Sequence, residues 1–507
     1  NDAQLHHTPA EGWVLAGDPT EGALLSMARK AGLDPAEEAA LTPRRDDIPF
    51  ESEHRFMATL HHDHALAGRA FCLLKGAPER VLGLCVRDAA GLPLDAAAWQ
   101  ARMDGAASQG QRVLALAECE LPAGTSELTL EHITPRFTLL GLVGLMDPPR
   151  PEAVAAVAEC QQAGVRVLMI TGDHATTAAA IGASLGLRDG NPITGAEIDT
   201  LDDAALGARL AQTDVIARAS PEHKLRLVAN LQAGGQLVAM TGDGVNDAPA
   251  LKAADIGVAM GQRGTDAARE AADLVLTDDN FATIAHAVRE GRRVFDNIKK
   301  SLLFILPTNG GEAGLILAAV FAGLALPVTA AQILWVNMVT SITLDMALAF
   351  EPAEDGVMRR PPRPAGEPLI TRLLFVRIAY ITVLMVAATF VVYGWELSRG
   401  HSIEVARTAV VNMLVMSEIF YLFNVRHFTA SAFRWETLAG NRIAVWACVI
   451  TLGLQALFTY APPMQALFGT APLDAWSWLL ITALASAKFV VVEIEKAVLR
   501  RMGIQRM

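Results

Sequence analysis

Six long apolar stretches follow one another in the C-terminal part of the chain. They lie at 302–325, 328–350, 373–395, 405–424, 441–461 and 475–494. An apolar helix of about 20 residues spans the hydrocarbon core of a bilayer. A single stretch of this kind also occurs as a buried helix of a soluble protein. Six in succession predict an all-α transmembrane bundle, which we place at 297–507.

Shorter apolar runs upstream end in loops rich in Gly and Asp. Val165–Ile170 leads into Thr171-Gly172-Asp173, and Gln236–Met240 leads into Thr241-Gly-Asp-Gly-Val-Asn-Asp247. Continuous apolar runs of this length are typical of buried parallel strands. The pattern therefore predicts an α/β region with functional loops at the carboxyl ends of its strands.

Composition and charge agree with a membrane protein. Charged residues make up 19% of the 507 residues, the mean hydropathy is +0.31 and the net charge is −12. The negative charge argues against nucleic-acid binding. Because basic residues gather in cytoplasmic connections, we expect both ends of the bundle and the soluble region to be cytoplasmic. The basic residues before the first span and between the second and third are Arg292, Arg293, Lys299, Lys300, Arg359, Arg360, Arg363 and Arg372.

The loop after Met240 carries oxygen ligands. Asp243, Asn246 and Asp247 provide two carboxylates and an amide at the end of a strand, which suits a hard cation such as Mg²⁺. A short loop of this composition is more often a solvated turn. Here the specific order extends over some twenty residues, from Met240 to Met260, which favours a metal site.

Two further segments favour phosphate binding. Thr171-Gly172-Asp173 offers a hydroxyl and backbone N–H groups, and Arg218-Ala-Ser-Pro-Glu-His-Lys224 ends in a lysine that is either a phosphate ligand or a solvated surface residue. The order and spacing of these motifs resemble those of P-type ATPases, membrane pumps of the haloacid-dehalogenase superfamily. The resemblance implies catalytic roles for Thr171, Gly172, Asp173, Lys224, Asp243, Asn246 and Asp247.

The same resemblance extends toward the N-terminus. Lys75-Gly-Ala-Pro-Glu79 matches the segment whose lysine lines the adenine pocket of these pumps, and Phe50 matches the phenylalanine on which adenine stacks. Glu21, Arg112 and Arg218 match further nucleotide contacts, and Asp147-Pro-Pro-Arg150 matches a hinge. Alone, Phe50 would more often be a core residue. The resemblance implies ATP and Mg²⁺ as cofactors.

The resemblance also implies a fold. We expect a partial α/β nucleotide-binding domain with an antiparallel sheet at 1–133. A partial haloacid-dehalogenase-like, Rossmann-like phosphorylation domain follows at 134–296, and then the six-helix transmembrane bundle. The family's Asp-Lys-Thr-Gly motif, whose aspartate becomes phosphorylated, is absent, since the chain contains no Asp-Lys dipeptide. We therefore expect the C-terminal portion of a longer pump, from a split or truncated gene, that binds ATP without turnover.

Polar residues inside the first two apolar stretches indicate an ion path, because such residues are costly in lipid. Asn309 and Glu312 lie in the first stretch, and Asn337, Thr340, Ser341 and Asp345 lie in the second at helical spacing. Hydrogen bonding between helices is the alternative for the amide and hydroxyl groups, but it fits two carboxylates poorly. Glu418 in the fourth stretch is a weaker candidate ligand.

The sequences of these two stretches resemble those of the corresponding helices of calcium pumps. Ser341 stands where those pumps have an aspartate, so the ion remains open: Ca²⁺ leads, with Na⁺, K⁺, Mg²⁺ and Mn²⁺ as alternatives. The expected partners are ATP, the cation, the lipid bilayer and a missing N-terminal portion of the pump, in a bacterial plasma membrane. The alternatives are a non-catalytic split or remnant chain that binds nucleotide and ion or regulates a full pump, and a phosphatase fused to unrelated helices.

Overall fold

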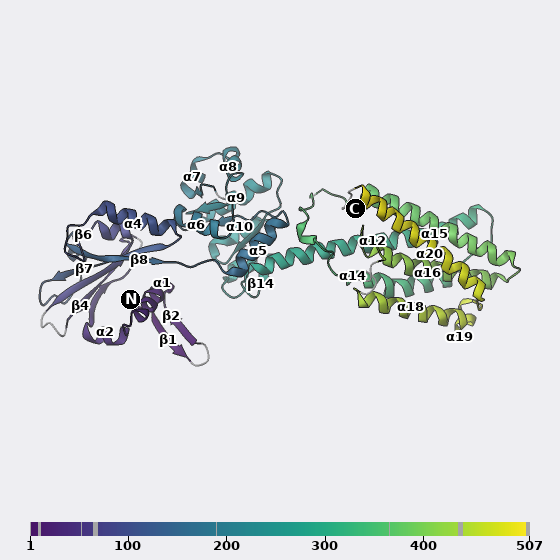
Figure 1. Ribbon diagram of the computed structural model, residues 1–507, viewed down its shortest axis with the longest axis horizontal. Coiled ribbons are helices and arrows are strands. Elements are labelled where there is room, and N and C mark those ends of the chain that lie inside the picture. Colours follow the sequence, from purple (N-terminus) through teal and green to yellow (C-terminus); the bar gives the residue numbers. More distant parts are fainter. Residues whose placement is uncertain are drawn as a thin grey trace. The chain divides into compact units, whose positions relative to one another are not determined.

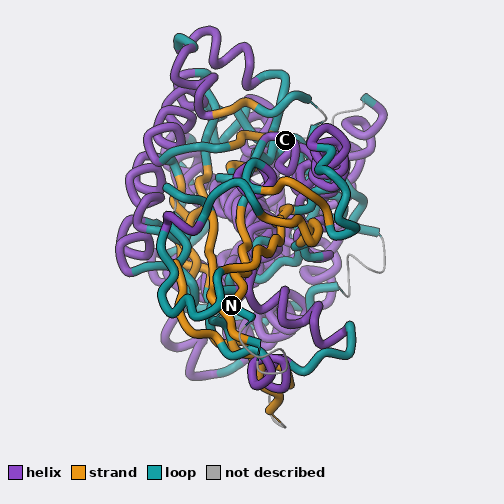
Figure 2. The backbone as a smooth tube through the Cα atoms, turned by 90° about the vertical axis from the view of Figure 1, so that its left-hand side faces the viewer, coloured by secondary structure: helices purple, strands orange, loops and turns teal. Residues whose placement is uncertain are grey.

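The computed structural model describes residues 2–8, 12–51, 53–63, 69–188, 190–364, 366–433 and 440–502. Two compact units divide the chain. The first comprises 1–158 and 166–282, and the second comprises 159–165 and 283–507. Strands lie in the first unit, whereas the second is helical (Figure 1; Figure 2). Each unit is described by itself.

A six-stranded sheet forms the N-terminal part of the first unit. Its strand order is β3-β4-β5-β7-β8-β6, and all neighbours are antiparallel except the parallel pair β6 and β8. A separate hairpin of β1 and β2 precedes it. The elements are β1 (Gln4–Thr8), β2 (Gly12–Ala16), α1 (Pro19–Lys30), α2 (Pro35–Leu41), β3 (Arg44–Ile48), β4 (Phe56–His62), β5 (Ala70–Gly76), α3 (Pro78–Leu82), β6 (Cys85–Asp88), α4 (Ala96–Ser108), β7 (Arg112–Leu121), η1 (Leu130–His132) and β8 (Phe137–Leu145).

The antiparallel sheet extends beyond residue 133, where the sequence predicted its domain to end. Phe137 to Leu145 form β8, which pairs with β7 from Arg112 opposite Leu145 onward. The core of this sheet includes Phe137 and Leu139, both fully buried. The apolar residues of this segment thus pack in the core of the first sheet. The chain leaves that sheet just before Asp147.

Two three-stranded parallel sheets follow in the same unit. Their orders are β10-β11-β9 and β12-β13-β14. The elements are α5 (Pro151–Gln162), β9 (Met169–Ile170), α6 (Ala175–Ser184), β10 (Ile193–Thr194), α7 (Gly195–Thr200), α8 (Asp203–Leu210), β11 (Val215–Ala217), α9 (Pro221–Ala233), β12 (Ala239–Gly242), η2 (Val245–Asp247), α10 (Ala248–Ala253), β13 (Ile256–Met260), α11 (Asp266–Ala271) and β14 (Leu274–Leu276).

The parallel strands of the domain expected to be partial form two separate sheets among the described residues. β9 and β12 are both edge strands among the described residues. Val165 to Leu168 and Gln236 to Val238, predicted as strand, are not strand in the structure. A strand needs a partner to satisfy its backbone groups, so an edge without a neighbour shortens β9 and β12 relative to their apolar runs.

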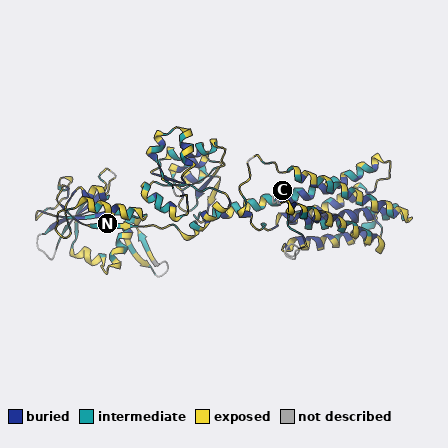
Figure 3. Ribbon diagram, turned by 45° about the horizontal axis from the view of Figure 1, so that its top comes forward, coloured by how far each residue is buried: buried dark blue, intermediate teal, exposed yellow. Residues whose placement is uncertain are grey.

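The second unit is a helical bundle. Among the described residues, six helices are long and apolar enough to cross a membrane, which agrees with the six predicted spans. Figure 3 shows buried positions along the inner faces of these helices. The elements are α12 (Ala282–Phe321), α13 (Ala330–Thr340), η3 (Ser341–Asp345), α14 (Met346–Ala349), η4 (Val357–Arg359), α15 (Arg372–Ser398), α16 (Ile403–Val425), α18 (Arg442–Tyr460), α19 (Pro462–Phe468) and α20 (Ala475–Arg501).

Glycines in α12 allow close packing against α15. A Cβ atom on Gly310 would lie 2.9 Å from the Thr382 hydroxyl oxygen, and one on Gly314 would lie 2.9 Å from a methyl group of Val386. Small residues at helix contacts let backbones approach in membrane bundles. Glu312 lies two residues from each of these glycines, on the other side of α12, where it is buried.

Candidate functional site

The antiparallel sheet gathers the predicted nucleotide contacts at one end. Lys75, at the end of β5, pairs with Met57 near the start of β4 and with Leu116 of β7. Arg112 is the first residue of β7, and Phe50 follows the end of β3 on the same side. The Phe50 side chain is 60% exposed. An exposed aromatic ring near a lysine and an arginine is chemically suited to a purine and its phosphates.

Glu21 joins this end of the sheet through an ion pair with Lys75. Its other carboxylate oxygen accepts hydrogen bonds from the backbone N–H groups of Asp2 at 2.7 Å and Ala3 at 3.0 Å. Burial by itself raises the pKa of Glu21, but Lys75 and the two N–H donors outweigh burial and lower the pKa to about 2. Glu21 is therefore a fixed anion that orients Lys75.

The loop after β9 forms a local network. The Thr171 hydroxyl donates to the Asp173 carboxylate at 2.9 Å and accepts from the Asp173 N–H at 3.1 Å. The Arg218 N–H donates to the Asp173 carbonyl at 3.2 Å, and Arg218 has a φ of 51°. Gly172 and Asp173 are exposed. Thr171, Asp173 and Arg218 therefore come together at the carboxyl ends of β9 and β11.

Lys224 and Asp247 form a second network. Lys224, in the first turn of α9, donates to Asp247 Oδ1 at 2.5 Å. Asp247 is buried, and its Oδ2 accepts from the N–H groups of Asp243 at 3.3 Å and Gly244 at 3.2 Å. A Cβ on Gly242 would lie 2.5 Å from the Asp247 Cβ, so only glycine fits beside this carboxylate. The structure thus connects the predicted phosphate-binding lysine with the predicted metal loop.

These contacts bear on the predicted Mg²⁺ ligands. Both oxygens of Asp247 already hold Lys224 and the loop, whereas Asp243 and Asn246 are exposed. Within the described ranges, no group of three or more His, Cys, Asp or Glu side chains is arranged to hold a metal. Mg²⁺ commonly takes one or two carboxylates and completes its shell with water and phosphate oxygens. Asp243 therefore fits as a ligand, and Asp247 fits as the residue that shapes the loop.

In the bundle, Glu312 and Asn337 join two helices. The Asn337 side-chain amide on α13 donates to Glu312 Oε2 on α12 at 2.8 Å. Thr340 is buried one turn after Asn337, and its hydroxyl and Glu312 both lie beside Glu418 of α16. Glu418 is 1% exposed, and its Oε2 has no hydrogen-bond partner within the described residues. Oxygen atoms from three helices therefore converge, as a hard cation requires.

Three predicted ligands lie outside this cluster. Asn309 is exposed because the buried stripe of α12 runs through Thr308, Gly311 and Glu312, one residue out of phase with Asn309. Ser341 is exposed because it lies three residues after Met338, on the exposed side of α13. The chain from Ser341 to Asp345 then forms a π-helical turn, which breaks the expected stripe before Asp345. Thr343 points inward instead, 2.7 Å from the Thr451 hydroxyl.

Asp345 lies near Ser301 of α12 rather than near Glu312. Ser301 and Glu312 are eleven residues apart, which is about 16 Å along a helix. One oxygen of Asp345 is buried without a hydrogen-bond partner in the described structure. The predicted pair of acids, Glu312 and Asp345, is thus replaced by the pair Glu312 and Glu418. The sequence marked Glu418 only as a weaker candidate, because Asn412, Ser417 and Asn424 give the same span other polar positions and local spacing does not show which of them faces Glu312.

Comparison with known proteins assigns the chain to a family. Residues 1–152 match the cytoplasmic domain N of P-type ATPases, residues 223–288 match the haloacid dehalogenase-like hydrolases, and residues 325–498 match the C-terminus of cation-transporting ATPases. The three matches follow one another in the order of the sheets and the bundle. The chain belongs to the cation-transporting P-type ATPases.

Curated relatives match almost the whole chain. A probable cation-transporting ATPase F of Mycobacterium tuberculosis is 47% identical over 97% of this chain and 55% of its own length. The cation-transporting ATPase pma1 of Synechocystis is 41% identical over 95% and 54%. A calcium-transporting ATPase of Bacillus subtilis is 37% identical over 96% and 55%. The chain therefore spans about half the length of the curated relatives it matches.

Proposed function

We propose that this chain is the C-terminal part of an ATP-driven P-type cation pump that couples ATP hydrolysis, through an aspartyl phosphate, to ion transport. The observation that carries the proposal is the buried contact of Glu312 with Asn337, beside Glu418. Buried carboxylates inside a membrane bundle are costly unless they serve a function. The relation to P-type ATPases supports ATP-driven cation transport as the function of such a site.

The soluble residues take roles that follow from their geometry. Phe50, Lys75 and Arg112 bind the adenine and phosphates, with Glu21 orienting Lys75. Thr171 holds a phosphoryl oxygen and Lys224 neutralises its charge, because phosphoryl transfer depends mainly on positioning and electrostatic stabilisation. Mg²⁺, bound at Asp243, would neutralise further charge on the phosphoryl oxygens. Asp247 keeps the loop in register with Lys224, and Asn246 is exposed in the same loop, where its amide oxygen can face the Mg²⁺ and its waters.

Ca²⁺ is the proposed cargo. Two carboxylates, an amide and a hydroxyl give an oxygen-rich site of the kind that suits a divalent cation. Calcium transport in the name of the Bacillus relative is further support. The proposal places the sheets and the C-terminus on the cytoplasmic side of a bacterial plasma membrane, in keeping with the basic connections. We propose domains at 1–145, 147–281 and 282–502, which shift the predicted boundaries to the end of β8 and the start of α12.

A non-catalytic role is the second candidate. It is favoured by the separation of β9 from β12 into two sheets among the described residues. On this view the chain binds nucleotide and cation, or regulates a full pump, without forming a phosphoenzyme. Both candidates share the expectation that the chain alone does not turn over ATP.

Incubation with ATP labelled at the γ-phosphate tests the proposal. The purified chain should bind a fluorescent ATP analogue but form no acid-stable phosphoprotein. Co-expression with a segment that carries Asp-Lys-Thr-Gly should restore cation-dependent phosphorylation and ATP hydrolysis. Phosphorylation of the chain alone would contradict the proposal, and a co-expressed pair that remains inactive would favour the non-catalytic role.

A further inference from the structure

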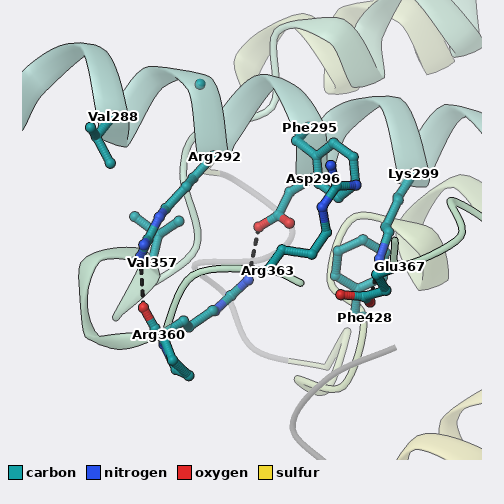
Figure 4. Close-up of a pocket in the computed structure, with 12 residues that line it drawn as sticks. Val288, Arg292, Phe295, Asp296, Lys299, Val357, Arg360, Arg363, Glu367 and Phe428 are labelled. Carbon is teal, nitrogen blue, oxygen red and sulfur yellow. Dashed lines mark hydrogen bonds and ion pairs between the residues drawn. The ribbon is translucent and has the colours of Figure 1, made fainter. Parts of the chain in front are cut away.

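A pocket of about 380 Å³ lies in the helical unit beside the first half of α12. Its walls come from Val288 to Lys299 of α12, from the segment between Val357 and Glu367, and from Phe428 after α16. Figure 4 shows side chains of α12 pointing toward the loop that carries Arg360 and Arg363. The volume is at the lower end of the range of about 300–1,000 Å³ that is typical of small-molecule sites.

The wall is held in place by Arg292. Its guanidinium donates to the carbonyls of Ala163 at 2.8 Å, Val357 at 2.9 Å and Arg360 at 2.8 Å. Arg360 in turn pairs with Asp296 at 2.9 Å. These contacts fix the loop on α12, so the pocket is a formed feature of the unit rather than a gap between loose segments.

The lining carries more positive than negative charge. Its cations are Arg292, Lys299, Arg360 and Arg363, whereas its carboxylates are Asp296 and Glu367. Asp296 is engaged by Arg360, and Glu367 lies 3.6 Å from Lys299. The lining therefore has two positive charges in excess of its carboxylates, and an anion would restore the balance.

Arg363 is the cation best placed to receive an anion. Its guanidinium carbon lies 4.0 Å from the centroid of the Phe295 ring, and the residue is exposed. Among the described residues, Arg363 forms no ion pair with a carboxylate. Stacking on an aromatic ring holds the guanidinium plane while its N–H groups stay available at the edge. This geometry offers a paired donor set of the kind that binds phosphate oxygens.

We propose that this pocket binds an anionic phosphate group, with Arg363 as the principal ligand. Phe295 and Phe428 supply apolar surface beside the charged edge, and α12 enters its apolar run at Leu302, directly after Lys299 and Lys300. Basic pockets at this position, just outside a membrane span, suit lipid headgroups. The phosphate is thus either the headgroup of an anionic phospholipid or a soluble phosphate. The inference goes beyond the proposed pump function and does not depend on it.

Binding measurements on the full chain in detergent test the proposal. Phosphatidylglycerol in mixed micelles is one probe, and inorganic phosphate and glycerol 3-phosphate are the soluble probes, with phosphatidylcholine as the zwitterionic reference. R363Q should weaken binding about tenfold or more, since it removes a charge-assisted contact. R359Q is the matched control, because Arg359 is exposed in the same loop and does not line the pocket.

The binding results distinguish a lipid headgroup from a soluble phosphate as the source of the phosphate group. Saturable binding of phosphatidylglycerol alone, weakened by R363Q and not by R359Q, identifies a lipid headgroup. The same pattern with the soluble probes identifies a soluble phosphate. No saturable binding to any probe, equal binding of phosphatidylcholine, or equal effects of the two substitutions would overturn the proposal.

Discussion

The side-chain amide of Asn337 donates a 2.8 Å hydrogen bond to Glu312, and this bond joins α12 to α13 inside the bundle. The contact depends on how closely α12 packs on its neighbours. Gly310 and Gly314 face Thr382 and Val386 of α15 without room for larger side chains. α12 therefore contacts α15 on the side of these glycines and α13 through Glu312 on its other side.

Replacing Gly310 by valine should therefore destabilise the bundle. The new side chain would meet Thr382, whose hydroxyl lies 2.9 Å from the site of a Cβ, and overpacking of this kind costs about 1–3 kcal/mol. Thermal unfolding in detergent, followed by circular dichroism, measures the effect. Gly453 in α18 has open space around it, so G453V should leave the midpoint nearly unchanged. Equal midpoints for both variants would show that the glycine contact is unimportant.

Much of this arrangement could be predicted from the sequence, because it depends on local pattern. The six spans follow from apolar length, and the loops that carry Thr171 and Asp243 follow from the apolar runs that end as β9 and β12. The phase of the second span could not be predicted. The π-helical turn from Ser341 to Asp345 has no signal in the residue types; within it Thr343 contacts the Thr451 hydroxyl, and Asp345 lies beside Ser301.

Other differences between the predicted and the observed structure depend on contacts with segments that are distant in the sequence. Glu418 gains its position from the packing of α16 against α13, which brings it within electrostatic reach of Glu312 on α12. β8 lies in the antiparallel sheet because β7 offers it a partner over most of its length. Conversely, β9 is only two residues long because one of its edges has no neighbour within the described residues.

Lys224→Ala should loosen the loop that carries Asp243. Asp247 is only 5% exposed, and without Lys224 its charge would have no opposite partner. Uncompensated burial of this kind should cost about 1–3 kcal/mol. Hydrogen–deuterium exchange should accelerate in peptides that cover 239–260. Lys252 is exposed nearby, and K252A should leave exchange unchanged; similar exchange in K224A would contradict the role given to the ion pair.

The Glu21–Lys75 pair should make the nucleotide end of the antiparallel sheet sensitive to acid. The pKa of Glu21 is about 2 in the folded chain, below its ordinary value of 4.5. A depressed pKa stabilises the folded state above pH 4.5, and this contribution is lost as the pH falls toward 2. After allowance for solvent screening we expect about 1–2 kcal/mol.

Hydrogen–deuterium exchange of residues 12–30 between pH 5 and pH 2.5, with intrinsic rates corrected for pH, measures this loss. E21Q should be less stable at pH 5 and should show a flatter dependence on pH. Glu37 is exposed on α2, so E37Q serves as the control. An acid dependence in E21Q as steep as in the unmodified chain would rule out Glu21 as its source.

Phe50→Ala should weaken nucleotide binding without affecting stability. The ring is 60% exposed, and stacking of a base on an aromatic side chain contributes about 1–3 kcal/mol. We therefore expect the Kd for ATP to rise roughly tenfold or more in isothermal titration. Leu92 is 62% exposed in the same unit, and L92A should bind ATP normally. Unaltered affinity in F50A would remove Phe50 from the proposed site.

Equilibrium binding of radioactive Ca²⁺ to the purified chain is the most direct test of the cation site. The unmodified chain should bind Ca²⁺ saturably, and E312Q and E418Q should each weaken binding at least about tenfold. S341A should bind as the unmodified chain does, because Ser341 is exposed outside the cluster. Saturable binding that survives both E312Q and E418Q would contradict the assignment of these carboxylates to cation transport.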